Sequence, residues 1–281
     1  MREATVEDLM DRYRVLLLDA YGVLVHSSGA IDGARELIEA LNRSGKPYYV
    51  LTNDASKLPA TAAARYRGFG LAIEPERIIT SGGLITGYFH AHGLSCAPAV
   101  VLGPADSALY VELAGGRVAP PGEPFDALVI CDEEGFPFVE TVDAALSALF
   151  RKLDRGEAVH LVLPNPDLIY PRADGGFGMT AGSVALVFEA ALHLRYPDRP
   201  DLRFVRLGKP HAAMFQEALS RSGTMDMVMI GDQFETDIRG ASEFGLASAL
   251  VAGGVTSRGF EKEGPGHRPT YLLRSIGPSR P

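Results

Sequence analysis

Short apolar runs alternate with segments of helical periodicity along most of the chain. A run of four or five apolar residues is typical of a strand buried on both faces, and apolar residues three and four apart are typical of one helix face. In the first third of the chain, the pattern predicts strands at 15–19, 47–51 and 78–79, and helices at 5–12, 32–44, 57–67 and 84–92. Such alternation indicates a parallel sheet with right-handed crossovers.

The alternation restarts near residue 96 and continues to the end of the chain. The middle of the chain predicts strands at 97–102, 126–131 and 159–163 and helices at 105–114 and 139–153, with Pro- and Gly-rich clusters at 119–124 and 171–178. The last third predicts helices at 181–195, 211–222 and 237–244 and strands at 204–207, 227–230, 247–251 and 270–273. We therefore predict an α/β fold, a doubly wound parallel sheet from residues 1–95 and 180–281 with a smaller α/β domain inserted at 96–179.

Composition and charge limit the classes of protein to which the chain can belong. The chain has 281 residues, 46% of them hydrophobic and 22% charged, which is ordinary globular usage. A net charge of −8 argues against sequence-independent binding of nucleic acid, which needs a basic face. The N-terminus lacks the apolar core of a signal peptide, and no run approaches the ~20 apolar residues of a membrane span. We expect a cytoplasmic protein with no membrane partner, in which Cys96 and Cys131 are buried thiols.

Polar residues follow several predicted strands at the points where these strands end. In an open α/β sheet, ligands bind at the carboxyl ends of the strands, so these side chains are expected at one edge. A carboxylate there can attack a phosphoryl group, two more can hold Mg²⁺, and a hydroxyl, an amide and an ammonium can donate to phosphoryl oxygens. The residues are Asp19, Thr52, Asn53, Lys209, Asp232 and Asp237.

Several candidates also have an ordinary structural interpretation. Asp19 could cap the turn that follows it, Lys209 could be a surface lysine beside a turn, and Asp237 could cap the helix that begins there. Asn165 and Asp167, within an Asn-Pro-Asp segment after a predicted strand, have the composition of turn residues. Both interpretations stay open at this point.

Four segments, in this order, resemble the haloacid dehalogenase-like superfamily. They are Asp19-Ala20-Tyr21-Gly22-Val23-Leu24, Leu51-Thr52-Asn53, Gly208-Lys209-Pro210 and Gly231-Asp232-Gln233-Phe234-Glu235-Thr236-Asp237. Each motif alone is weak, but four in order, each after a predicted strand, are specific. Their spacing resembles the class IIA branch, which includes the bacterial nucleotide phosphatase, 4-nitrophenylphosphatase-like proteins and vertebrate pyridoxal-phosphate and phosphoglycolate phosphatases. The resemblance spans roughly residues 15 to 275 and implies a C2-type cap.

The resemblance implies catalytic and metal-binding roles. Asp19 corresponds to the nucleophile and to a metal ligand, and Tyr21 would offer its backbone carbonyl to Mg²⁺. Lys209 would hold the phosphate and the nucleophile. Asp232 would ligate the metal, and Asp237 would ligate it or support a ligand.

The resemblance also implies a phosphate- and substrate-binding set. Thr52 and Asn53 would hold the phosphoryl group, with Asp54 beside them, and Asn165 and Asp167 match a short motif of the cap. The cap, expected at 96–179, would close over the strand ends and select a small phosphorylated metabolite. Dimers formed through the cap are common in this branch, so a homodimer is one expected assembly.

Tyr21 departs from the usual pattern. Most phosphatases of the superfamily carry a second Asp two residues after the nucleophile, where it acts as general acid and base, and such proton transfer contributes typically ~10²–10⁴-fold. Tyrosine, with a pKa near 10, is a poor base at neutral pH. The expected reaction is Mg²⁺-dependent hydrolysis of a phosphate monoester through an aspartyl-phosphate, slow on alkyl phosphates and faster on leaving groups that need no proton.

Two alternatives follow from the same tyrosine. The chain could be a phosphoryl-ligand binder or regulatory protein without turnover. It could also be a haloacid dehalogenase, because these enzymes carry Asp-x-Tyr-Gly at this motif and use no metal. Against the dehalogenase, 32 residues separate Asp19 from Thr52, which leaves no room for a cap between them, and Asp232 and Asp237 are retained.

Overall fold

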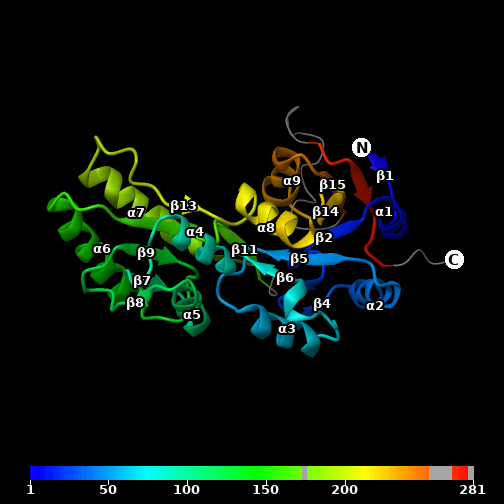
Figure 1. The fold of residues 1–281 in the computed structure, drawn as a ribbon, viewed down its shortest axis with the longest axis horizontal. Coiled ribbons are helices and arrows are strands. Elements are labelled where there is room, and N and C mark those ends of the chain that lie inside the picture. The colour runs from blue at the N-terminus through cyan, green and yellow to red at the C-terminus, as the bar shows by residue number, and fades with distance from the viewer. Residues whose placement is uncertain (173–175, 253–267, 278–281) are drawn as a thin grey trace. The chain divides into compact units, whose positions relative to one another are not determined.

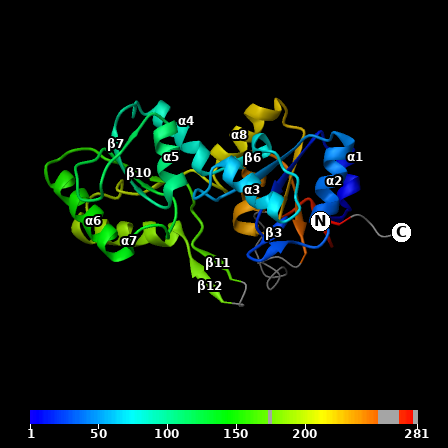
Figure 2. The ribbon, with the colours of Figure 1, turned by 90° about the horizontal axis from the view of Figure 1, so that it is seen from below.

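The computed structural model describes residues 1–172, 176–252 and 268–277, and its chain forms two compact units (Figures 1 and 2). The first unit comprises Met1–Thr52, Pro59–Ile79 and Lys209–Pro281, and the second comprises Asn53–Leu58 and Thr80–Gly208. The second unit begins before and ends after the inserted domain expected at 96–179. The reason is that apolar helix faces on both sides of that range pack in the second unit.

The first unit is built on a seven-stranded sheet. Its strand order is β1 (Arg2–Glu3), β16 (Tyr271–Leu273), β15 (Ala247–Val251), β14 (Met227–Gly231), β2 (Val15–Asp19), β5 (Tyr48–Thr52) and β6 (Ile78–Thr80). The pairs from β1 through β5 are parallel. Every residue of β2 is buried, as its apolar run predicts.

Helices cover both faces of this sheet, which confirms the predicted doubly wound arrangement. On one face, α1 (Val6–Arg12), α2 (Ala34–Ser44) and α3 (Pro59–Gly68) bury apolar side chains against alternate strand residues such as Leu16 and Leu18. Figure 1 shows α8 (Ala212–Ser222) and α9 (Arg239–Phe244) on the other face. A π-helical turn at Phe234–Ile238 precedes α9, where a simple helix was expected.

The second unit has its own parallel sheet. The strand order is β13 (Val205–Arg206), β10 (His160–Leu163), β9 (Ala127–Ile130), β7 (Pro98–Leu102) and β8 (Arg117–Val118), and every pair is parallel. One core cluster joins this sheet to α6 (Phe138–Asp154) and α7 (Ala181–Arg195), and another joins it to α4 (Ile85–Ala91) and α5 (Ala105–Leu113). The inserted sheet is therefore covered on both faces too.

Smaller elements were not predicted as strands or helices. An antiparallel hairpin, β11 (Ile169–Pro171) and β12 (Phe177–Met179), occupies the Pro- and Gly-rich cluster at 171–178. A second hairpin pairs β3 (Val25–His26) with β4 (Gly29–Ala30), and 3-10 turns lie at Pro75–Arg77 and Gly82–Leu84.

The two cysteines differ in exposure. Cys131 is buried as expected. Cys96 is exposed, so the expectation that it is buried was wrong; it lies in the turn between α4 and β7 with a positive φ of 60°.

No helix among the described residues combines the length and the hydropathy that crossing a membrane requires.

Candidate active site

The first two carboxylates of the candidate site lie at the ends of two neighbouring strands. Asp19 is the last residue of β2, and Asp232 follows directly after β14. The strands are parallel, with Leu18 paired to Ile230, so Asp19 and Asp232 leave the sheet at the same edge. Asp237 comes from the π-helical turn that follows β14.

The three carboxylates form a buried cluster. Each offers an oxygen within 4.8 Å of those of the others, and the residues are 5%, 1% and 0% exposed in chain order. Among residues 1–172, 176–252 and 268–277, no other group of three or more His, Cys, Asp or Glu has this geometry. Hard carboxylate oxygens are the ligands that Mg²⁺ prefers, so the residues present fit the ion that the sequence implies.

Lys209 binds two members of this cluster. Its Nζ donates to Oδ1 of Asp19 at 2.5 Å and to Oδ1 of Asp237 at 2.7 Å. The lysine is 2% exposed, which excludes a surface lysine beside a turn. Burial alone would lower the pKa of Lys209, but Asp19 and Asp237 outweigh it and raise that pKa above its usual value. The ammonium therefore stays protonated and holds the two carboxylates together.

The cluster has more negative than positive charge. Burial raises the pKa of Asp19 well above its usual value, and Asp237 and Asp232 raise it further against the opposing effect of Lys209. One ammonium faces three carboxylates, so an additional cation would favour the ionised form of all three. This imbalance is a second reason to regard the cluster as a cation site.

Two glycines let the carboxylates approach the backbone. A Cβ built on Gly22 would come within 2.7 Å of Oδ1 of Asp232 and closer to the rest of that carboxylate, and Gly22 has a φ of +93°. A Cβ on Gly231 would likewise collide with the side chain of Asp237. At both positions a side chain would occupy the place of a carboxylate.

The side chain of Asp237 belongs to the cluster, whereas the ring of Tyr21 packs against the apolar core of the first unit. Asp237 accepts the backbone N–H of Gln233 with Oδ2 at 3.2 Å, while its Oδ1 faces Lys209, so it does more than cap a helix. Tyr21 is half-buried, and its backbone pairs with Val25.

The predicted phosphate-binding residues divide between the two units. Thr52 ends β5 in the first unit, next to Leu51, which is paired with Asp19 across the sheet, and it is buried. Asn53 follows Thr52 in the chain but belongs to the second unit, together with Asp54. The first unit thus brings together Asp19, Thr52, Lys209, Asp232 and Asp237, whereas the second holds Asn53, Asp54, Asn165 and Asp167.

Within the second unit, hydrogen bonds assign several of these residues. Asn53 donates its Nδ2 to Oδ1 of Asp167 at 2.9 Å. Asn165 accepts the backbone N–H of Asp167 with Oδ1 at 3.1 Å, which is a turn role. Asp54 accepts from Ser56 and from Lys57, so it also organises its own turn.

Ser81 is a residue that we did not predict. It is 0% exposed, and its Oγ donates to the backbone carbonyl of Asn53 at 2.6 Å. Ser81 directly follows β6, so the signal that identified Thr52, a polar residue at the end of a strand, could also have identified it.

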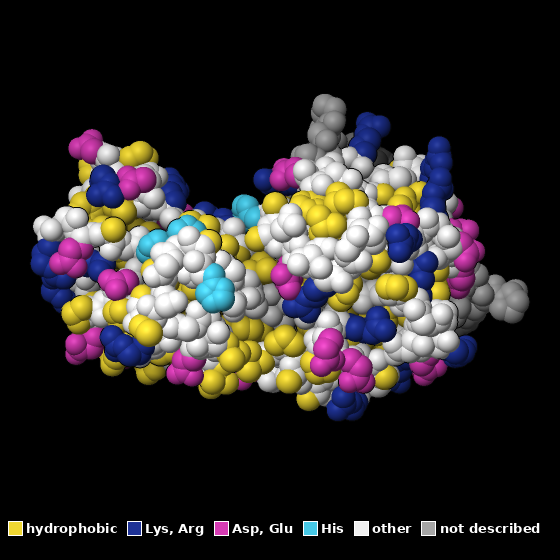
Figure 3. All heavy atoms as spheres, viewed as in Figure 1, with side chains coloured by type: hydrophobic (Ala, Val, Ile, Leu, Met, Phe, Trp, Pro, Cys, Tyr) yellow, Lys and Arg dark blue, Asp and Glu magenta, His cyan; other side chains and the backbone are white. Residues whose placement is uncertain are grey.

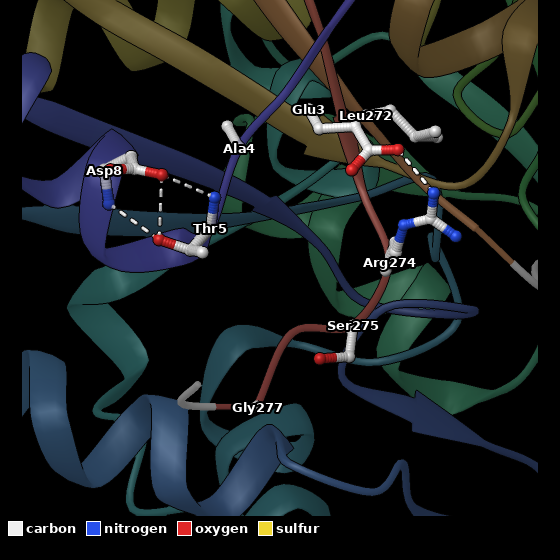
Figure 4. A pocket seen from close by; sticks show the side chains of 8 residues that line it. All are labelled: Glu3, Ala4, Thr5, Asp8, Leu272, Arg274, Ser275 and Gly277. Atoms are coloured by element: carbon white, nitrogen blue, oxygen red, sulfur yellow. Dashed lines mark hydrogen bonds and ion pairs between the residues drawn. The ribbon is translucent and has the colours of Figure 1, made fainter. Parts of the chain in front are cut away.

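A cavity of about 270 Å³ lies at one edge of the first unit's sheet, beside β1 and β16 (Figure 4). An ion pair between Glu3 and Arg274 and the capping interaction of Thr5 with Asp8 occupy its wall. None of the predicted site residues lines it.

On the face in Figure 3, basic and acidic side chains are interspersed.

Comparison with known proteins supports the resemblance. A family model of haloacid dehalogenase-like hydrolases matches residues 16–117, and a HAD-hydrolase-like model matches residues 206–278. Dihydroxyacetone phosphatase of Corynebacterium glutamicum is 28% identical over 262 residues, which are 92% of this chain and 88% of that protein.

Solved structures with the same fold include proteins that are described as phosphatases. A possible sugar phosphatase from Cytophaga hutchinsonii has a TM-score of 0.85 at 28% identity, with all of both chains covered. The p-nitrophenyl phosphatase from Archaeoglobus fulgidus has a TM-score of 0.76 at 25% identity and covers 94% of this chain and 97% of its own.

Proposed function

Because the chain belongs to the haloacid dehalogenase-like hydrolases, in the branch of the p-nitrophenyl phosphatases, we propose that it hydrolyses a small phosphate monoester through an aspartyl-phosphate at Asp19. The observation that carries this proposal is the buried group of Asp19, Asp232, Asp237 and Lys209. It combines a nucleophile, a cation site and an ammonium at one sheet edge, which phosphoryl transfer requires.

The reaction has two steps at Asp19. A carboxylate oxygen of Asp19 attacks phosphorus, and the bond from phosphorus to the leaving oxygen breaks. Water then hydrolyses the aspartyl-phosphate, which releases phosphate and regenerates Asp19. Lys209 orients the attacking carboxylate through its hydrogen bond to Oδ1. Mg²⁺ held by Asp19, Asp232 and the carbonyl of Tyr21, with Asp237 in support, would supply positive charge to the phosphoryl oxygens.

The names of related proteins suggest the class of substrate. Relatives with more than 90% of this chain aligned include a dihydroxyacetone phosphatase and acid sugar phosphatases, the latter from Staphylococcus species at 26% identity. We infer that this chain acts on a small phosphorylated sugar or a metabolite of similar size.

The first test of this function is its dependence on Mg²⁺. We expect the purified chain to hydrolyse 4-nitrophenyl phosphate with millimolar Mg²⁺, and to lose at least about a hundredfold in rate when a chelator removes divalent ions. Without the cation, Lys209 alone opposes the charge of three carboxylates, which repel an incoming phosphate. Restoring Mg²⁺ in excess of the chelator is the control. Phosphate binding without turnover in Mg²⁺ would instead favour the phosphoryl-ligand binder, and metal-independent halide release would favour the dehalogenase.

Tyr21 gives a second test, directed at the leaving group. With no carboxyl group in place of its ring, the chain is expected to hydrolyse alkyl phosphates slowly and aryl phosphates faster, since only the former need a proton on the departing oxygen. Tyr21→Asp is expected to raise kcat on an alkyl phosphate by about tenfold or more and to change kcat on 4-nitrophenyl phosphate less.

Tyr21→Asn is the matched control, because it removes the same ring contacts from the core but supplies no proton. Thermal unfolding of both variants separates the loss of packing from the effect on chemistry. Equal rates for the two variants on every ester would contradict the proposal that a proton donor is what this site lacks.

A further inference from the structure

We propose that His92 and His160 form a second metal site, which takes a divalent transition ion such as Zn²⁺ through its two imidazole nitrogens. His92 directly follows α4, and His160 is the first residue of β10, so both belong to the second unit. The contacts that support this site all lie within that unit. The inference goes beyond phosphate hydrolysis and does not depend on it.

The two imidazole rings are separated by the distance that a shared metal ion requires. Their centroids lie 5.3 Å apart, with an angle of 69° between the ring planes. A Zn²⁺ ion lies about 2 Å from a ligating imidazole nitrogen, and therefore about 3 Å from the centroid of that ring. Two rings that share the ion at a tetrahedral angle then have centroids about 5 Å apart. The observed separation agrees with this value.

Tyr88 contacts one nitrogen of each ring and leaves the other nitrogen for a ligand. Nδ1 of His92 lies 2.8 Å from the backbone carbonyl of Tyr88. Because a carbonyl can only accept, this nitrogen carries the hydrogen, and the neutral ring has its lone pair on Nε2. Nδ1 of His160 lies 3.1 Å from the hydroxyl of Tyr88, which can accept its hydrogen in the same way. In the part of the chain that the structure describes, no protein group is hydrogen-bonded to either Nε2.

The same tyrosine restricts how the two rings can turn. Its ring stacks on that of His92 with the centroids 4.0 Å apart, and it meets the ring of His160 edge-on with the centroids 5.9 Å apart. Metal-binding histidines commonly donate their second nitrogen to a carbonyl or to another acceptor, which fixes the ring. Rings that are already oriented lose less freedom when an ion binds.

The surroundings of His160 favour a cation over a proton. Burial lowers the pKa of His160, and His92 lowers it further against the opposing effect of Asp126, so the ring is neutral at pH 7 and able to ligate a metal. The carboxylate of Asp126 contributes negative charge nearby. Asp126 and His160 also line a cavity of about 430 Å³, together with Gly93, which directly follows His92. This space can hold the water molecules that complete the coordination of the ion.

The pair of histidines differs in chemistry from the carboxylate cluster of the first unit. Imidazole nitrogens suit Zn²⁺, Cu²⁺ and Ni²⁺, whereas Mg²⁺ prefers hard oxygen ligands. We therefore expect the two sites to take different ions, and excess Mg²⁺ to leave the histidine site available to Zn²⁺.

Calorimetric titration of Zn²⁺ into the full chain, without an affinity tag and in excess Mg²⁺, tests the proposal. Wild type is expected to bind one Zn²⁺ ion at this site, and His92→Gln and His160→Gln are each expected to weaken that binding about a hundredfold. Tyr88→Phe is expected to weaken it about tenfold, because this change keeps the ring and the backbone carbonyl but removes the hydroxyl next to His160.

Electron paramagnetic resonance of the chain loaded with one equivalent of Cu²⁺ gives a second readout. The hyperfine coupling is expected to show two nitrogen ligands in wild type and one in either glutamine variant. The wild-type spectrum needs no variant to fold, and fewer than two nitrogen ligands in it would overturn the inference.

Two variants serve as controls and are expected to bind Zn²⁺ as wild type does. His90→Gln is the matched one, because His90 is an exposed histidine of the same helix, α4. Cys96→Ser removes the exposed thiol that lines the cavity. An equal loss in His90→Gln and His92→Gln would show general affinity of surface histidines, and a comparable loss in Cys96→Ser would show a thiolate ligand; either result would overturn the inference.

Discussion

Asp19→Asn is expected to lower kcat on 4-nitrophenyl phosphate by about 10⁴-fold or more, because an amide oxygen cannot form the phosphoryl–enzyme bond. The substitution keeps the size of the side chain and an acceptor for Lys209, whose Nζ lies 2.5 Å from Oδ1 in the native chain. Steady-state turnover in saturating Mg²⁺, with wild type measured in parallel, gives the result.

The same variant is expected to unfold at the same or a higher temperature than wild type. In the folded chain, burial and two neighbouring carboxylates raise the pKa of Asp19 above its unfolded value, so the ionised group destabilises the fold at neutral pH. A neutral amide removes that repulsion. This combination, no activity with undiminished stability, is what separates a chemical role from a structural one.

Asp226→Asn is the control for Asp19→Asn, because it makes the same exchange on an exposed turn of the same unit. We expect it to leave the rate unchanged. More than about 1% of wild-type turnover in Asp19→Asn, after exclusion of contamination and deamidation, would contradict nucleophilic catalysis by Asp19.

Gly22→Ala has the second large expected effect. The added methyl group would collide with the carboxylate of Asp232, and the φ of +93° is strained for any residue with a Cβ. Because Asp232 must move, we expect at least about a hundredfold loss of turnover at fixed Mg²⁺, partly recovered at higher Mg²⁺ concentration. A titration of rate against Mg²⁺ measures this shift in metal requirement.

Gly245→Ala provides the matched comparison. Gly245 has a φ of +86° and nothing within 4 Å of its built Cβ, so it carries the backbone strain without the collision. Both variants are expected to lose about 1 kcal/mol of stability from that strain. Only Gly22→Ala should also change the Mg²⁺ dependence; a similar change in Gly245→Ala would show that strain, not contact with Asp232, is responsible.

Much of the fold was predictable because long buried strands and amphipathic helices carry strong periodic signals. The run ending at Asp19 and the helix at Ala34–Ser44 are examples. The hairpin at Ile169–Met179 could not be predicted in this way, since its strands have three residues each and contain Pro171 and Gly178, which disfavour strands. The two-residue strand at Arg2–Glu3 is formed through pairing with residues about 270 positions away.

The residues of the candidate site could be predicted from the sequence, but the hydrogen bonds between them could not. Strand ends identified Asp19, Lys209 and Asp232, because parallel strands bring their carboxyl ends to one edge. The contact between Asn53 and Asp167 joins residues 114 positions apart and depends on how one loop turns, which a pattern of residue types does not encode. Ser81 escaped notice because a serine after a strand is common.

The short segment Asn53–Leu58 has a consequence for anyone who builds chimeras of this protein. It belongs to the second unit although the sequence on either side of it belongs to the first. There, the carbonyls of Ala55 and Lys57 accept from Ser107 and Tyr110, and the N–H of Leu58 donates to Asp106. A graft of residues 80–208 alone would lack these six residues and their hydrogen bonds. To exchange the whole second unit between relatives, two segments must therefore be transferred, not one.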